Sequence, residues 1–477
     1  MTSALAPSRS VPLSQNKWAA LAVLMAGTFM IVLDFFIVNV ALPSMQSELQ
    51  ASTSAIEWVV AGYGLTFATC LITAGRIGDR IGRRRAFTIG LGLFTVTSIA
   101  CGLAPDPRLL IVARLLQGLA AALISPNVLA IIGVAYQGAE RVRALTVYGM
   151  VMGFAAASAQ LIGGALIQAD IAGAGWRTVF LINLPVGLAA MLLAPCQLPE
   201  SRASRDGAQI DLLGTLLVTS GLTALLLPLV EGRQQGFPAW TWLSLGLAPV
   251  LLASFVLHQL RLSRRGGRPL LEPRLFRARS FSAGLLTQLA FWSGMASFFV
   301  VLALYLQEGR GLNALQAGMV FTILATAYLG TSLRAPRLTL KYGRRLILVG
   351  ALMLAAGYGL MLVGVDLAAS ADGFTWIAAL VPGLALAGAG MGLCITPLVA
   401  TVLSSVQAEH AGSASGILST VQQLGNALGV AVTGLIFFGA LTQGGYSYAF
   451  ELSLAEFVVL LVGVAGLSRL LPRGVQA

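Results

Sequence analysis

The segment GRIGDRIGRRR, from Gly75 to Arg85, is the most informative part of this 477-residue chain. It holds five arginines, three glycines and one aspartate between apolar runs at 56–75 and 86–104. As helices, such runs rise about 1.5 Å per residue and can cross a hydrocarbon core about 30 Å thick. The glycines permit a tight connection, and the arginines favour anionic lipid headgroups. We therefore expect a basic loop between two membrane-spanning helices.

The composition extends this expectation to the whole chain. Hydrophobic residues make up 57% of it and charged residues only 10%, whereas a soluble domain carries about a quarter charged residues. The formal charge of +12 could indicate nucleic acid, but the basic residues separate apolar runs and do not interleave with aromatic residues. The four cysteines lack metal-ligand spacing, and phosphate-binding and zinc-protease motifs are absent. We expect an integral membrane protein that is not an enzyme, with no cofactor, metal or nucleic-acid partner.

Fourteen apolar runs are long enough to span a bilayer, and their continuous apolar character predicts helices rather than alternating barrel strands. They lie at 18–42, 56–75, 86–104, 108–133, 143–168, 176–198, 212–230, 240–262, 281–306, 315–335, 345–365, 374–398, 412–440 and 447–470. With a cytoplasmic N-terminus, 25 of the 30 Lys and Arg residues fall in inside segments, four fall outside, and Arg114 lies within a span. By the positive-inside rule, we expect both termini on the cytoplasmic side of the cell (plasma) membrane.

The chain also contains an internal repeat of two six-span blocks. We expect a tail at 1–17, an N-terminal six-helix bundle at 18–198, a linker with two inserted helices at 199–280, a C-terminal six-helix bundle at 281–470 and a tail at 471–477. Each block has an arginine-rich connection between its second and third spans, although the second keeps only a final Gly-Arg-Arg at 343–345. Repeated halves of this kind are typical of secondary transporters, whose substrate site lies between the halves.

Four segments carry a resemblance to a known family. The spacing in Gly75–Arg85 resembles the signature loop of the major facilitator superfamily, and RLLQG, from Arg114 to Gly118, is similar to its span-four pattern. LDFFIVNVALP, from Leu33 to Pro43, resembles the first-span signature of the fourteen-span drug:proton antiporters, with Phe36 in place of the usual Thr. GWRTVFLINLPVG, from Gly175 to Gly187, looks like their entry to span six. The resemblance implies an all-α major facilitator fold of two pseudo-symmetric six-helix bundles plus a two-helix insert.

The resemblance also implies that the signature loop is a conformational latch that favours an outward-open state. Its residues are Gly75, Gly78, Asp79, Arg80, Gly82, Arg83 and Arg84. A topogenic anchor alone is the alternative reading of this loop.

The fifth span departs from the family pattern. Antiporters of this superfamily typically have a Gly-Pro pair before GGxL, and this chain has Ala159-Gln160 instead. Small residues around this position still allow helices to approach closely, so we expect an inter-bundle helix motif at Gly153, Gln160, Gly163 and Gly164. Because this motif lacks its proline, the case for antiport rests on the charged residues within the spans.

Two ionisable residues lie at similar depth in the first block. Asp34 is about 13 Å inward of Pro43, and Arg114 is about 10 Å inward of Pro107, so they can pair or join a network through Gln117. Burial favours the neutral acid and the arginine favours the carboxylate, so a change in their distance could switch protonation. In the resembled family the span-four arginine is implicated in proton coupling. A permanent ion pair that fixes helix register is the alternative.

Other polar residues in the spans are weaker candidates. Glu456 lies in an apolar run without a basic neighbour and is a second candidate for proton coupling; an acid facing a wet crevice is the alternative. A substrate cavity needs apolar and aromatic walls with a few polar groups. The candidates for its lining are Phe35, Phe36, Asn39, Tyr63, Phe67, Gln288, Trp292, Gln422, Gln423 and Asn426.

These observations favour a proton-coupled secondary transporter that exports drugs or other lipophilic or amphiphilic small molecules by alternating access. Its partners would be the small-molecule substrate, protons and membrane lipids, and it would confer multidrug or antibiotic resistance. One alternative is a transporter of a specific metabolite, such as a self-made antibiotic, a sugar or an amino acid. Another is a membrane sensor that transports nothing. Substrate charge, the choice between proton and sodium, and the oligomeric state, a monomer included, stay open.

Overall fold

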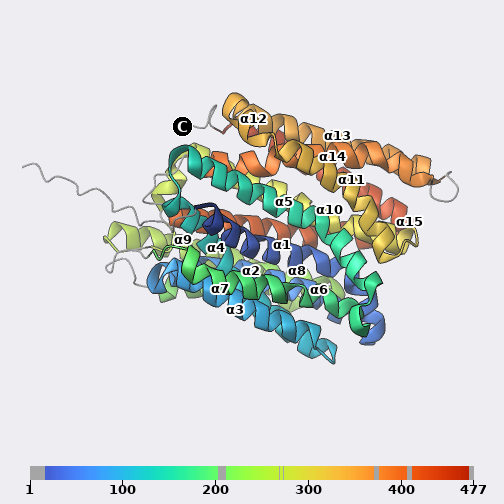
Figure 1. Cartoon of the computed structure of the whole chain (residues 1–477), viewed down its shortest axis with the longest axis horizontal. Helices are drawn as coiled ribbons and strands as arrows, with labels where there is room; N and C mark the ends of the chain where they lie inside the picture. Colours follow the sequence, from blue (N-terminus) through green and yellow to red (C-terminus); the bar gives the residue numbers. More distant parts are fainter. Residues whose placement is uncertain are drawn as a thin grey trace, which may run out of the picture.

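The computed structural model describes residues 17–201, 211–267, 269–271, 273–369, 375–404 and 411–471, and these residues form an all-helical protein (Figure 1). The expected terminal tails lie almost entirely outside these ranges. Within them, thirteen helical stretches are long and apolar enough to cross a bilayer. The last, α15 (Ala411–Ser468), has 58 residues and breaks at Gly445, where φ is 74° and ψ is −171°. Because it is about twice the length that one crossing needs, α15 accounts for the predicted thirteenth and fourteenth spans.

The helices form two six-span bundles and a two-helix insert. The N-terminal bundle consists of α1 (Lys17–Glu48), α2 (Thr53–Ile81), α3 (Arg83–Gly102), α4 (Pro107–Ala135), α5 (Gly138–Ala169), α6 (Thr178–Leu181) and α7 (Asn183–Gln197), with α6 and α7 sharing one span. The insert is α8 (Leu212–Gln234) and α9 (Ala239–Arg264). The C-terminal bundle consists of α10 (Arg279–Leu304), α11 (Ala314–Ser332), α12 (Ala335–Tyr342), α13 (Arg344–Ala369), α14 (Trp376–Ser404) and α15. The predicted fold class is therefore confirmed.

Local sequence signals set several helix ends. Asp106 caps α4 by accepting hydrogen bonds from Arg108 N and Leu109 N, at 2.9 and 3.0 Å, with Pro107 at the first helical position. Asn313 and Gln316 form a reciprocal capping box at the start of α11. These caps satisfy backbone N–H groups that a helix leaves unpaired at its first turn.

The arginine-rich segment differs from the loop that we expected. Residues 75–81 continue α2, so Gly75 and Gly78 are helical, and the chain reverses at Gly82 alone. Gly82 has φ of +109°, a conformation that a residue with a Cβ rarely adopts. Gly78 instead permits a close helix approach, because a Cβ there would lie 1.9 Å from Asn127 Oδ1 of α4.

The two bundles meet along α5 and α11, which run antiparallel. A Cβ at Gly164 would lie 2.5 Å from Ala314 O, and a Cβ at Gly318 would lie 2.7 Å from Gln160 O. Nearer the arginine-rich end, Tyr328 Oη donates a hydrogen bond to Gly149 O at 2.7 Å. The backbones of the two helices can approach this closely only because small residues lie between them.

The insert packs beside α2 and α15. Val218 and Leu222 of α8 and Phe255 of α9 bury their side chains against Ile72 of α2, and Leu424 of α15 packs on the same cluster. The insert therefore contacts one helix from each bundle.

Asp211 ties the arginine-rich end of the insert together. It accepts hydrogen bonds from Gly214 N and Gln259 Nε2, both at 2.8 Å, and pairs with His258 Nε2 at 2.9 Å. Burial acts to raise the pKa of Asp211, but these partners outweigh it and hold the pKa below its usual value. Gln259 Oε1 also accepts a hydrogen bond from Leu271 N, which fixes the segment that follows α9.

Candidate functional site

A buried ion pair occupies the interior of the N-terminal bundle. Arg114 Nη1 of α4 donates a hydrogen bond to Asp34 Oδ2 of α1 at 2.5 Å, and both side chains are 0% exposed. The predicted pairing from matched depth is therefore present. Because removing one member of such a pair leaves an uncompensated buried charge, breaking it costs about 3–5 kcal/mol.

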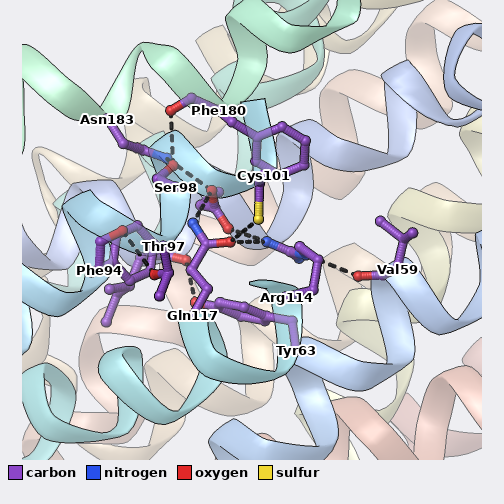
Figure 2. A network of polar contacts seen from close by, with 12 residues as sticks. Val59, Tyr63, Phe94, Thr97, Ser98, Cys101, Arg114, Gln117, Phe180 and Asn183 are labelled. Atoms are coloured by element: carbon purple, nitrogen blue, oxygen red, sulfur yellow. Dashed lines mark hydrogen bonds and ion pairs between the residues drawn. The ribbon is translucent and has the colours of Figure 1, made fainter. Parts of the chain in front are cut away.

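Polar side chains from α4 and from two further helices, α3 and α7, complete the network around the pair (Figure 2). Gln117 Nε2 and Asn183 Nδ2 donate to Asp34 Oδ1 at 3.0 and 2.8 Å, and Arg114 Nη1 also donates to Gln117 Oε1 at 2.8 Å. Asn183 further donates to Ser98 Oγ at 3.0 Å. The carboxylate thus accepts three hydrogen bonds, which connect α1 to α4 and α7.

Arg114 is also held from the side of α2. Its Nε donates to Val59 O at 2.9 Å, and its guanidinium lies 4.3 Å from the centroid of the Tyr63 ring. Figure 2 shows both residues beside the arginine. Tyr63 Oη in turn donates to Ile31 O at 3.2 Å. Arg114 Nη2 has no hydrogen-bond partner among the residues that the structure describes. The arginine therefore keeps several contacts that do not depend on the charge of Asp34.

The sequence indicated some of these residues and missed others. Asp34, Arg114 and Gln117 are brought together as predicted. Tyr63, which we expected to line a substrate cavity, lies under Arg114 inside the bundle, and Phe67 packs against it with 5.7 Å between ring centroids. Asn183 was missed, although it lies within the Gly175–Gly187 segment. An amide in an otherwise apolar run was the signal that could have found it.

Helix α1 carries the ion pair on one side and an inter-bundle contact on the other. Phe36 is two residues beyond Asp34, about 200° around the helix. Its ring lies 5.0 Å from that of Phe299 of α10, and Phe299 stacks on Phe321 of α11 at 5.7 Å between centroids. A movement of α1 therefore affects both the polar network and the contact between bundles.

Gln160 occupies the place where the family pattern has proline. Helix α5 continues through Gln160, whose Nε2 donates to Phe36 O of α1 at 3.3 Å. Within the described part of the chain, Gln160 Oε1 has no hydrogen-bond partner. Gly163 faces α1, where a Cβ would lie 2.5 Å from Val40 Cγ1. Gly153 packs against the side chain of Tyr328 of α11. The four predicted motif residues thus contact α1 and α11.

At the arginine-rich end, ion pairs connect the start of α3 to neighbouring elements. Arg83 donates to Asp79 Oδ1 at 3.1 Å from Nε and 2.9 Å from Nη2. Arg84 N donates to Glu200 Oε1, beyond α7, at 3.2 Å, whereas the side chain of Arg80 is exposed. Asp79 lines a small cavity that it shares with Asn127 of α4 and with 416–417 at the start of α15.

The remaining predicted cavity residues separate into two groups. Phe35 contacts Phe36, and Asn39, Gln288 and Trp292 are buried on α1 and α10. Leu424 of α15 faces α2 and the insert, so Gln422 and Asn426, each two residues away, lie on the opposite side of that helix. Gln423 Oε1 accepts a hydrogen bond from Asn426 Nδ2 at 3.2 Å. The assignment of Gln422, Gln423 and Asn426 to the lining of a substrate cavity stays a prediction.

Glu456 lies apart from the Asp34 network. It is on the second half of α15, half-buried, and its carboxyl contacts the hydroxyl of Thr433 in the first half of that helix. The neighbouring Phe457 packs against Phe298 and Tyr358 inside the C-terminal bundle.

Comparisons with known proteins agree with this architecture. The sequence profile of the Major Facilitator Superfamily matches residues 24–430. The solved structure of a proton:xylose symporter superposes with a TM-score of 0.64 at 15% identity, over 93% of this chain and 94% of the symporter, which shows a shared fold.

Curated relatives are more similar in sequence. The probable actinorhodin transporter of Streptomyces coelicolor is 41% identical over 89% of this chain and 73% of its own length. A multidrug resistance protein of Mycobacterium tuberculosis is 35% identical over 86% of this chain and 74% of its own length. A cephamycin export protein of Amycolatopsis lactamdurans is 33% identical over 99% of this chain and 96% of its own length.

Proposed function

Since this chain belongs to the major facilitator superfamily, we propose that it exports drugs or antibiotics from the cell in exchange for protons. The chain is a secondary transporter in a membrane, and relatives named for the export of antibiotics support the class of cargo. The main observation in favour of proton exchange is the Asp34–Arg114 ion pair, which is fully buried. Asp34 lies on one side of α1, and Phe36, which contacts the other bundle, lies on the opposite side. The distribution of basic residues supports a cytoplasmic position for the arginine-rich end.

Protonation of Asp34 would weaken the bonds that hold α1 to α4 and α7. The neutral acid no longer attracts Arg114 as an ion, whereas Arg114 keeps Val59 O, Gln117 and the Tyr63 ring as partners. Helix α1 could then shift relative to α4 and change its contact with α10. Alternating access follows if this shift opens one side of the inter-bundle space and closes the other. Glu456 is a second candidate for protonation, since it is a half-buried acid within a span whose carboxyl contacts the hydroxyl of Thr433.

The test is transport by purified protein in liposomes under an imposed pH gradient. With an acidic lumen, antiport should accumulate a non-titrating dye against its gradient, and with an alkaline lumen it should not. Liposomes without protein control for passive trapping, and a sodium gradient at constant pH tests the other coupling ion. Accumulation that follows sodium, or that ignores both gradients, would contradict proton exchange.

The arginine-rich segment would act as a latch between the bundles at the cytoplasmic end. Asp79 of α2 lines a small cavity together with Gly416 and Ile417 of α15, so it lies close to a helix of the other bundle. We expect Asp79→Asn to lower transport by up to about fivefold, as for a partly exposed charge contact worth at most about 1 kcal/mol. Membrane insertion should remain normal by protease protection. Glu140→Gln, which removes an exposed acid paired with Lys17 at 2.8 Å, is the control. Unchanged transport by Asp79→Asn would mean that the arginine-rich segment is a topogenic anchor alone and not a latch.

A further inference from the structure

The insert is fixed to α2 at three levels. At the end far from the arginine-rich segment, Trp58 Nε1 of α2 donates a hydrogen bond to Glu231 Oε1 of α8. Farther along, Thr219 Oγ1 of α8 donates to Thr69 O of α2 at 3.3 Å. At the arginine-rich end, Arg76 of α2 bonds to the segment that follows α9. Hydrogen bonds at both ends and between them therefore attach the insert to the N-terminal bundle.

The segment 269–271, which we call the strap, follows α9 and lies against the arginine-rich end of α2. Arg76 Nη2 donates to the carbonyl oxygens of its first two residues, at 3.0 Å for Leu270 O. On the other side, Gln259 Oε1 of α9 accepts a hydrogen bond from Leu271 N at 3.3 Å. A guanidinium is a charged donor, so its hydrogen bonds are stronger than those between neutral groups. Two helices, α2 and α9, therefore fix the backbone of the strap.

The strap lines the small cavity at the arginine-rich end of the two bundles. Its residues Leu270 and Leu271 share this cavity with Asp79 of α2, Asn127 of α4 and Gly416 of α15. Helices α2 and α4 belong to the N-terminal bundle and α15 belongs to the C-terminal bundle, whereas the strap belongs to neither. The strap therefore occupies space between the bundles that water would enter if it left.

We propose that the insert moves as one body with the N-terminal bundle, and that the strap forms part of the gate that closes the cytoplasmic end of the transporter. Arg76 is the positioning residue that holds the strap in this gate. When rocking of the bundles opens this end, α15 parts from the strap, because the hydrogen bonds of the strap join it to α2 and α9. This inference rests on the alternating access of the proposed function and adds a role for the insert.

The thiol of Gly416→Cys can report on this gate, because Gly416 lines the cavity and a Cβ there meets no atom within 4 Å. Mass spectrometry of the corresponding peptide gives the rate at which a maleimide labels this thiol in purified protein. Arg76→Met keeps the apolar stem of the side chain but removes its donors, and it should raise this rate at least about tenfold, which corresponds to 1.4 kcal/mol. Gln259→Leu releases the strap from the side of α9 and should also raise the rate, so the test does not depend on one variant folding. Arg264→Met removes an exposed arginine at the end of α9 and should leave the rate unchanged.

Cross-links test whether the strap stays with α2 during transport. A short bifunctional maleimide joins Leu271→Cys either to Gly416→Cys of α15 or to Ile72→Cys of α2, and all three residues line the cavity. Compared with the same variants before linking, the link to α15 should abolish gradient-driven dye transport in liposomes, and the link to α2 should preserve it. Transport that survives the link to α15 overturns the gate, as do labelling rates that Arg76→Met and Gln259→Leu leave unchanged. Absence of flux before linking instead contradicts the proposed function, whereas the labelling rates test the gate without transport.

Discussion

Asp34→Asn is expected to abolish export driven by a pH gradient while leaving the protein folded. The amide keeps the volume of the carboxyl group and one oxygen that can accept from Arg114, but it cannot take up a proton in the transport cycle. Both Asp34→Asn and Asp34→Ala remove the counter-ion of Arg114, but alanine would be a poorer test, because it also leaves a cavity and removes the acceptor of Gln117 and Asn183.

The measurement for Asp34→Asn combines two assays on the same liposomes. Accumulation of dye with an acidic lumen should fall to the level of protein-free liposomes, while exchange of labelled for unlabelled dye at equal pH should persist. Asp366→Asn removes an acid at the far end of α13 and should retain both activities. Full gradient-driven transport by Asp34→Asn would mean that the pair is a structural ion pair and that the coupling proton binds elsewhere.

Gly164→Leu is expected to separate the bundles along α5 and α11. A Cβ at Gly164 would lie 2.5 Å from Ala314 O and 2.8 Å from Leu315 Cα, and these are backbone atoms that cannot rotate away. Overpacking of this kind typically costs about 1–3 kcal/mol. The variant should therefore unfold several degrees below the wild type and lose transport, since the two bundles can no longer pack closely.

Gly330→Leu is the matched control, because a Cβ at Gly330 of α11 would meet no atom within 4 Å. Thermal unfolding of purified protein, followed by its intrinsic fluorescence, should distinguish the two variants. A wild-type unfolding temperature for Gly164→Leu would show that the close approach of α5 and α11 contributes nothing to stability.

Much of the candidate site could be predicted from the spacing of residues along the sequence. A helix rises by a fixed distance per residue, so the depth of a residue in the membrane follows from its distance along the chain to the end of the span. This argument predicted that Asp34 and Arg114 lie at the same depth. The rotation of a helix about its axis does not follow in an apolar run, because apolar residues surround the helix on all sides. Tyr63 was therefore assigned to a cavity lining although it lies under Arg114, and Asn183 was overlooked.

The sequence alone determined the spans, their grouping and the depth of Asp34 and Arg114, since a bilayer penalises charge and unpaired backbone wherever they occur. Tertiary structure decided which side chains meet. It placed Asn183 on Asp34, put Phe36 against Phe299 on the other side of α1, and allowed α2 to continue to Gly82 where a loop was expected. These outcomes depend on how helices turn and pack against one another, which hydrophobicity and charge do not encode.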